Sequence, residues 1–344
     1  MRHINIPVFI PHLGCPNQCI FCNQRLISGT YEFDEDVVCR TIDRVLSTAS
    51  SDDECEIAFF GGSFTGIDRG LMVRLLDIAQ SYVASGKIVG IRMSTRPDYI
   101  SEEIIEILKR YTVTFVELGI QTMNDSVLSY LKRGHAVSDT EKAAELLVAN
   151  GIKFVGQMMV GLPSATLEDE IACAKRICEL GASGARIYPT LVFRNTELEE
   201  ITAHGLYSPL TLDEAVDRAA AVLSVFDSYG VECIRIGLCD SDNLHSDDSF
   251  VAGPNSPSIG EMVKSRVYFG KICVDIDKLD IVTDKKTLNI YCAKGYTSQI
   301  IGHRRKNVID LKNKYGFSRV KVFEDCVLED KTYKFEIKEE NSCV

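Results

Sequence analysis

Short apolar runs alternate with amphipathic stretches of helical spacing between residues 4 and 188, and this alternation restricts the possible folds more than any other feature. The apolar runs predict strands at residues 4–10, 55–60, 89–94, 113–119, 153–160 and 184–188. The stretches between them predict helices at residues 35–49, 67–84, 101–110, 124–132, 138–150 and 166–180. Continuous apolar strands alternating with helices are typical of a parallel sheet. We therefore expect an α/β fold, either an open sheet or a (β/α)6 partial TIM barrel, with functional residues where the strands end.

The loop after the first apolar run contains Cys15, Cys19 and Cys22 in the spacing CxxxCxxC. Three thiolates on one loop can bind three irons of a [4Fe–4S] cluster and leave the fourth iron open, whereas a fully ligated cluster takes four cysteines. An open iron can bind a small molecule and pass an electron to it. The spacing therefore predicts a metal site of this kind.

Structural zinc and a disulfide are alternative interpretations of these cysteines. A closed zinc site takes four ligands, usually from two CxxC-like pairs. The chain has no second pair, although His12 is a possible fourth ligand. The remaining cysteines are scattered, at positions 39, 55, 173, 178, 233, 239, 273, 292, 326 and 343. Because 13 is an odd number and no secretory segment is present, a disulfide framework is disfavoured. Because the chain has no second CxxC-like pair, the cluster is preferred over zinc.

Polar or glycine-containing segments follow the other predicted strands. They cover residues 61–64, 94–98, 117–121, 157–163 and 186–190. Each segment alone is consistent with an ordinary turn or helix lead-in. Because parallel strands end at one rim of the sheet, the segments together predict a single site there.

These segments, taken with the cysteine loop, resemble the radical S-adenosylmethionine (SAM) enzymes. The chain is most similar to the radical domain of the Elongator catalytic subunit, which modifies the wobble uridine of tRNA, and it also resembles the oxygen-independent coproporphyrinogen oxidases. The likeness covers roughly residues 5–240. It is carried by the cysteine motif and by AFFGGSF at 58–64, STRPD at 94–98, VELGIQT at 116–122, IYPTLV at 187–192 and IRIGL at 234–238.

The resemblance implies a (β/α)6 partial barrel that binds a [4Fe–4S] cluster through Cys15, Cys19 and Cys22. It also implies SAM, which the reduced cluster cleaves to give a 5′-deoxyadenosyl radical. The implied cofactor contacts are Phe21, Gly61, Gly62, Ser94, Gln121, Arg133 and Gln157. Gly61 and Gly62 would let the backbone approach the methionyl amino group of SAM. An electron donor such as ferredoxin or flavodoxin is an implied partner.

Basic residues at the rim are candidates for holding an anionic substrate. They are Arg96, Arg186, Arg194 and Arg235. Arg186 and Tyr188 are also candidate catalytic residues. The alternative for Arg186 is an ion pair with a neighbouring carboxylate, which would give it a structural role.

The C-terminal part of the chain has a different charge balance. Residues 1–270 carry 23 Lys and Arg against 37 Asp and Glu, whereas residues 271–344 carry 15 against 12. Strands are expected at 271–276, 287–292, 318–323 and 332–337, with a helix from about Asn307 to Tyr315. A basic module on an acidic body suggests a separate partner.

Residues 286–323 resemble a KH RNA-binding module, which clamps about four nucleotides through a GXXG loop. Gly302 matches the first glycine of that loop, and Arg305 stands at the second. Arg304, Arg305 and Lys306 at a helix start would suit phosphate. The alternative is an α/β cap that only packs on the barrel.

Three domains are expected: a radical SAM partial barrel at 1–200, an α/β extension at 201–265 and a KH-like α+β domain at 266–344. The extension contains a predicted helix at 211–229, a strand at 231–237 and a polar loop at 239–258. About 80 residues after the barrel are too few for the acetyltransferase domain of the Elongator subunit. The carboxymethyl reaction is therefore not carried over.

The leading interpretation is a radical SAM enzyme that modifies RNA, specifically tRNA. One alternative is a radical SAM enzyme acting on a small molecule such as a tetrapyrrole. Another is a non-catalytic iron–sulfur protein that binds RNA. No apolar run reaches the ~18–20 residues of a membrane span, and 13 cysteines without a secretory segment predict a cytoplasmic protein.

Overall fold

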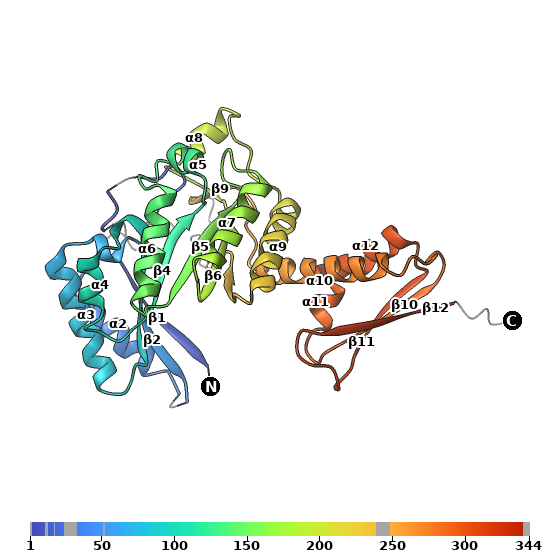
Figure 1. The fold of residues 1–344 in the computed structure, drawn as a ribbon, viewed down its shortest axis with the longest axis horizontal. Helices are drawn as coiled ribbons and strands as arrows, with labels where there is room; N and C mark the ends of the chain where they lie inside the picture. The colour runs from blue at the N-terminus through green and yellow to red at the C-terminus, as the bar shows by residue number, and fades with distance from the viewer. Residues whose placement is uncertain are drawn as a thin grey trace. The chain divides into compact units, whose positions relative to one another are not determined.

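The computed structural model describes residues 2–10, 13–16, 18–23, 33–50, 52–238 and 248–339. They form two compact units (Figure 1). Unit 1 comprises residues 1–215 and 225–255, and unit 2 comprises residues 216–224 and 256–344. The expected extension at 201–265 is thus divided between the units. His12, Cys239, Cys343 and the first part of the expected polar loop, 239–247, lie outside the described residues.

Unit 1 is built on a seven-stranded parallel sheet with the order β1-β2-β3-β4-β5-β6-β8. Its strands are β1 His3–Phe9, β2 Glu54–Phe60, β3 Gly90–Thr95, β4 Val113–Gln121, β5 Phe154–Val160, β6 Gly184–Pro189 and β8 Cys233–Ile236. Sequence order is also spatial order, which is the arrangement of a partial TIM barrel. The sheet confirms the predicted fold class, and Pro7 is tolerated because β1 is an edge strand.

The helices of unit 1 alternate with these strands, as the sequence predicts. They are α2 Asp36–Leu46, α3 Arg69–Ala84, α4 Glu102–Leu108, α5 Asp125–Tyr130, α6 Val137–Ala149, α7 Leu167–Glu179 and α8 Glu197–Ala203. The next helix, α9 (Leu212–Tyr229), has its two ends in unit 1 and residues 216–224 in unit 2. Short 3-10 turns η1 (Phe64–Gly66) and η2 (Pro97–Tyr99) follow β2 and β3. Ser101, Thr166 and Thr211 are N-caps of their helices, because each side chain accepts a hydrogen bond from a backbone N–H group of the first turn.

The two faces of this sheet differ in chemistry. Alternate residues of a strand point to opposite faces. One face is apolar and fully buried, and its residues include Ile57, Phe59, Ile91, Met93, Val116 and Leu118. The other face carries charged and polar side chains, which include Glu56, Arg92, Ser94, Glu117, Gln157 and Arg186. Helices cover the apolar side, where α6 and α7 pack against β5 (Figure 1), so the polar side is the face available to a site.

Two sequence predictions for the later part of the chain are wrong. Residues 250–252 are not loop: Phe250–Ala252 forms β9, which pairs antiparallel with β7 (Val192–Phe193). Residues 271–276 are not a strand, because they lie within the long helix α10, Ile259–Asp277. Ile272 and Ile276 are four residues apart and both buried, and a short apolar run does not distinguish a buried helix from a strand.

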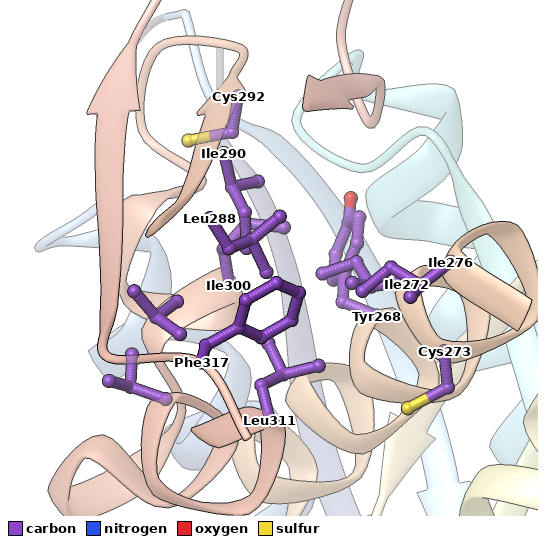
Figure 2. Packing of buried hydrophobic residues seen from close by; sticks show 12 residues of the cluster. Tyr268, Ile272, Cys273, Ile276, Leu288, Ile290, Cys292, Ile300, Leu311 and Phe317 are labelled. Carbon is purple, nitrogen blue, oxygen red and sulfur yellow. The ribbon is translucent and has the colours of Figure 1, made fainter. Parts of the chain in front are cut away.

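Unit 2 packs three helices on one face of a three-stranded sheet. Helices α10, α11 (Thr297–Ile301) and α12 (Lys306–Tyr315) accompany strands β10 (Thr287–Cys292), β11 (Arg319–Glu324) and β12 (Tyr333–Lys338). The order is β11-β10-β12, with β11 parallel and β12 antiparallel to β10. Figure 2 shows the core between the layers, where side chains of α10 such as Ile272 face Leu288, Ile290 and Phe317. None of the described helices of the chain is long and apolar enough to span a membrane.

Candidate functional site

The cysteine loop follows β1 and is tied to two other segments through its backbone. Cys19 is buried, and Cys15 and Cys22 are half-buried thiols that form no disulfide. The N–H of Ile20 donates to the carbonyl of Leu131 at 3.2 Å, and the carbonyl of Ile20 accepts from the N–H of Leu198 at 2.8 Å. These two backbone hydrogen bonds tie the middle of the cysteine loop to the residue after α5 and to α8.

Glycines allow the loop to lie directly against the segment after β2. A Cβ at Gly62 would lie 2.4 Å from the carbonyl oxygen of Leu13, and one at Gly14 would lie 2.2 Å from that of Ser63. The N–H of Ser63 also donates to the carbonyl of Leu13 at 3.0 Å. The missing side chain at Gly62 thus makes room for the cysteine loop itself, a role that the sequence analysis did not assign to it.

Two buried guanidinium groups lie beside the cysteines. Arg133 donates from Nη1 to the sulfur of Cys19 at 3.3 Å and from Nη2 to the carbonyl of Gly119 at 2.6 Å. Arg96 is held by Asp98 through two hydrogen bonds of 2.9 Å. Burial raises the pKa of the Cys15 thiol, and the two arginines oppose this by favouring the thiolate. The pKa of Cys15 stays above its ordinary value, so the effect of burial outweighs that of the two arginines.

His135 is buried next to the same charges. Burial, together with Arg133 and Arg96, lowers the pKa of His135 to about 3, so its imidazole is neutral at physiological pH. The sequence analysis missed this residue. A histidine two positions after an arginine gives no sequence signal of its own, since its environment depends on the fold.

The residues present fit a [4Fe–4S] cluster in the chemistry of their donor set. Three thiols on one short loop and an N–H donor to one sulfur are the kinds of groups that hold and tune such a cluster. Among the described residues, no three His, Cys, Asp or Glu side chains are gathered around a point that could hold a single metal ion. A cluster does not require that convergence, because each thiolate binds a different iron.

The polar face of the sheet is organised around Glu117, which is fully buried on β4. Its Oε1 accepts from Nη2 of Arg186 at 2.8 Å, and its Oε2 accepts from Nε2 of Gln157 at 2.6 Å. Arg92 forms an ion pair with the same carboxylate at 3.5 Å. The ion pair that the alternative for Arg186 requires is therefore present.

The same network continues to the edge strand β1. Arg92 pairs with Glu56 at 3.6 Å and donates to Oδ1 of Asn5 at 3.1 Å, and His3 lies 3.1 Å from Glu56. The sequence analysis missed Glu56 and Arg92. The available signal was a charged residue inside an apolar strand, because such residues are rarely buried unless paired.

Arg186 connects this charged layer to the rim. Its guanidinium lies 5.8 Å from the ring centroid of Phe60 and its Nη1 donates to the hydroxyl of Tyr188 at 3.5 Å. Tyr188 and Phe21 pack against one buried cluster, which includes Ile20 of the cysteine loop. The structure thus brings Tyr188 and Phe21, predicted as separate catalytic and cofactor residues, to one place.

The other predicted cofactor residues divide between the two parts of this site. Gln157 reaches Ser94 at 3.4 Å as well as Glu117, so it belongs to the charged layer. Gln121 has a φ of 68°, and a Cβ at Gly119 would lie 3.2 Å from Nε2 of Gln121 and 3.3 Å from Nη2 of Arg133. The side-chain amide of Gln121 and the guanidinium of Arg133 therefore face a shared region near the cysteines.

The predicted RNA-binding residues lie in unit 2, between α11 and α12. Arg304 and Arg305 are exposed and have φ values of 50° and 62°, in the left-handed region. A Cβ at Gly302 would lie 2.9 Å from the backbone nitrogen of Asn307. Lys306 is exposed and lies 3.9 Å from Asp310. The segment from Gly302 to Lys306 is therefore a fixed, basic turn, which we call the basic loop.

Comparison with known proteins gives two family matches along the chain. The radical SAM superfamily matches residues 9–177, and the radical SAM C-terminal domain matches residues 182–268. An uncharacterized protein of Methanocaldococcus jannaschii is 32% identical over 221 residues, which is 61% of this chain and 67% of that protein. The "tRNA uridine(34) acetyltransferase" of the same organism is 31% identical over 204 residues, 58% of this chain.

The curated relatives with a named activity are longer than the matched region. The chain covers 36% of that acetyltransferase and 37% of the Elongator complex protein 3 of Saccharomyces cerevisiae, to which it is 28% identical over 204 residues, 54% of this chain. Among solved structures, archaeal Elp3 of Methanocaldococcus infernus matches with a TM-score of 0.61 at 24% identity. The match covers 79% of this chain and 63% of that one. This likeness supports the fold of the barrel.

Proposed function

The chain belongs to the radical SAM superfamily, and we propose that it is a member that modifies tRNA. Members of the superfamily are enzymes that bind a [4Fe–4S] cluster and SAM. When bound, these cofactors supply an organic radical that removes a hydrogen atom from carbon. The chain itself binds, orients and shields the reacting groups, since the cofactors carry the difficult chemistry.

Cys15, Cys19 and Cys22 would hold the cluster, and the hydrogen bond from Arg133 to Cys19 is the observation that carries this assignment. A guanidinium N–H that donates to a cysteine sulfur favours the thiolate, which is the form that ligates iron. Gly61, Gly62, Phe21, Ser94, Gln121 and Gln157 remain the proposed SAM contacts. Arg133 would contact both the cluster and SAM.

Arg186 and Tyr188 would position the substrate. The carboxylate of Glu117 fixes the guanidinium of Arg186 at 2.8 Å, and Arg186 in turn donates to the Tyr188 hydroxyl at 3.5 Å. Both residues lie in or beside the apolar cluster at the cysteine loop. A side chain fixed by a buried ion pair is well suited to orient a polar group of a substrate, because its position costs little entropy on binding.

Two observations support tRNA as the substrate. The relatives called tRNA uridine(34) acetyltransferase are 27–32% identical to this chain over 52–59% of its length. The basic loop of unit 2 offers Arg304, Arg305 and Lys306 to phosphate groups, and Gly302 lets the loop turn. An electron donor such as ferredoxin or flavodoxin completes the proposal.

A buried side chain next to the basic loop fixes its conformation through hydrogen bonds. The side-chain amide of Asn307, 3% exposed, donates to the carbonyl and hydroxyl oxygens of Ser265 and to the carbonyls of Gln299 and Ile300. One side chain thus joins α10, α11 and α12. A preformed loop binds phosphate without first losing conformational entropy.

Anaerobic reconstitution tests the enzymatic part of the proposal. The protein is expected to bind about four irons and, with dithionite, to cleave SAM to 5′-deoxyadenosine. Cys19→Ser is expected to lose both properties, whereas Cys55→Ser, which changes a buried cysteine of β2, should keep them. Binding of zinc without iron, or iron without SAM cleavage, contradicts the proposal.

Mass spectrometry of tRNA nucleosides from a strain lacking the protein tests the substrate. We expect one modified nucleoside to disappear and to return when the wild-type gene, but not the Cys19→Ser variant, is supplied. An unchanged nucleoside profile with intact SAM cleavage would redirect the search to a small-molecule substrate.

A further inference from the structure

The sheet of unit 2 has a second face that takes no part in the core. Leu288, Ile290, Cys292 and Val320 point into the core with the helices, so the residues that alternate with them point the other way. We call this set the outer face, and it consists of Thr287, Asn289, Tyr291, Arg319, Lys321, Phe323, Lys334, Glu336 and Lys338.

Strand pairing arranges the outer face in rows across the sheet, with β10 in the centre. Tyr291 lies between Phe323 and Lys334, Asn289 lies between Lys321 and Glu336, and Thr287 lies between Arg319 and Lys338. Aromatic rings therefore sit at one end of the face, and basic side chains extend along both neighbouring strands.

The aromatic pair is open to solvent. The rings of Tyr291 and Phe323 are stacked, with centroids 5.4 Å apart and an interplanar angle of 25°. Phe323 is 42% exposed. Lys334 lies 5.7 Å from the ring centroid of Tyr291, and the Tyr291 hydroxyl donates to Glu336 at 2.6 Å. These contacts fix the orientation of Tyr291 while one side of the pair stays accessible.

The charge of the outer face is positive. Its one carboxylate, Glu336, accepts from Lys338 at 2.7 Å, and Lys334 pairs with Asp325 at 2.7 Å. Lys321 is exposed and makes no ion pair with any residue that the structure describes. A cation therefore stands next to the aromatic pair on the same strand, two residues from Phe323.

The central row contains an unsatisfied hydrogen-bond acceptor. Asn289 is 8% exposed, and its Nδ2 donates to Glu336 at 3.1 Å. Its Oδ1 accepts no hydrogen bond within the described parts of the chain. Leaving a buried acceptor unpaired is unfavourable. A hydrogen-bond donor on a bound molecule would supply the missing partner for Oδ1 of Asn289.

We propose that the outer face of unit 2 binds single-stranded RNA, with bases stacked on Phe323 and Tyr291 and phosphates held by Lys321 and its basic neighbours. Exposed aromatics on a sheet beside basic side chains are a recurring way to hold single strands. A protein partner is disfavoured, since the centres of protein interfaces are depleted in charged residues. The choice of RNA over DNA rests on the proposed function.

Fluorescence anisotropy of the full chain with a short, labelled oligouridylate tests the proposal. Phe323→Ala is expected to weaken binding about tenfold through loss of stacking, and Phe323→Tyr should keep near-wild-type affinity. Lys321→Ala should weaken binding less and lower the slope of affinity against salt by about one. Tyr229→Ala and Lys142→Ala, which remove an exposed aromatic and an exposed cation from unit 1, serve as matched controls.

The outer-face proposal is overturned if Phe323→Ala binds the oligouridylate as tightly as wild type while its melting temperature is unchanged. It is also overturned if a blunt RNA duplex binds as tightly as the single strand. Tighter binding of the matching DNA strand overturns the choice of RNA. The tRNA nucleoside experiment is independent of both. A lost nucleoside with RNA binding insensitive to Phe323 rejects the outer face alone. Weakened binding with unchanged tRNA supports the outer face and rejects tRNA modification.

Discussion

The two larger sheets that the structure describes both carry charged side chains within their strands, but these side chains are used in opposite ways. In unit 1 the charged residues face inward, and Glu117, Arg92 and Arg186 are nearly inaccessible and paired with one another. In unit 2 the charged residues face outward, and Lys321 lies in water beside an exposed aromatic ring. A buried charge must be paired within the protein, whereas an exposed charge remains available to bind a ligand.

The largest expected effect lies in the buried layer. Glu117→Ala removes the carboxylate shared by two buried guanidinium groups, and breaking a buried pair from one side costs about 3–5 kcal/mol of unfolding free energy. Chemical denaturation measures the loss. Glu106→Ala, which breaks the exposed pair with Lys109, should cost less than about 1 kcal/mol. Equal losses in the two variants would remove the distinction between buried and exposed charges.

Gly62→Ala tests whether the close approach of the cysteine loop to the backbone after β2 is needed for iron binding. The new methyl group would meet the carbonyl oxygens of Leu13 and Ile10 at 2.4 and 2.6 Å, so the cysteine loop must shift, at a cost of about 1–3 kcal/mol. We expect the reconstituted variant to bind less than half the iron of the wild type. Gly270→Ala, where the added methyl group meets no atom within 4 Å, should bind iron normally.

Asn307→Ala tests whether unit 2 also depends on a buried polar group. The change leaves the oxygens of Ser265, Gln299 and Ile300 without their common donor, and we expect a loss of about 1–3 kcal/mol. Thermal unfolding by circular dichroism measures it, with the exposed Asn313→Ala on the same helix as the control. A variant as stable as this control would contradict the role of Asn307.

The smallest effect belongs to the outer face and depends on pH. Hydrogen bonds from Lys338, Tyr291 and Asn289 lower the pKa of Glu336 from 4.5 to about 2. The folded state thus binds the proton less tightly than the unfolded state. The stabilisation is present above pH 4.5 and is lost as the pH falls toward 2. Wild type should exceed Glu336→Gln slightly in stability at neutral pH, with a difference that shrinks on acidification. A constant difference would exclude ionisation as its source.

Much of the barrel could be predicted because its strands are apolar throughout and its helices begin with capping residues such as Ser101 and Thr166. The cysteine loop could also be predicted, because its three cysteines lie close together in the sequence. The charged layer was not, because the contact of Arg186 with Glu117 depends on the register of strands that lie far apart in sequence. The helix over residues 271–276 was misread because its apolar residues also suit a strand.

Strand order in unit 2 has a consequence for how copies of the chain behave toward one another. Among the described strands of unit 2, only β10 has a neighbour on each side, so β11 and β12 are the edges of its sheet. Unprotected edges invite strand addition and aggregation, and lysines on edge strands discourage it. We therefore expect Lys321 on β11 and Lys334 and Lys338 on β12 to oppose self-association. Salt screens such charges, so concentrated protein should remain dispersed best at low ionic strength.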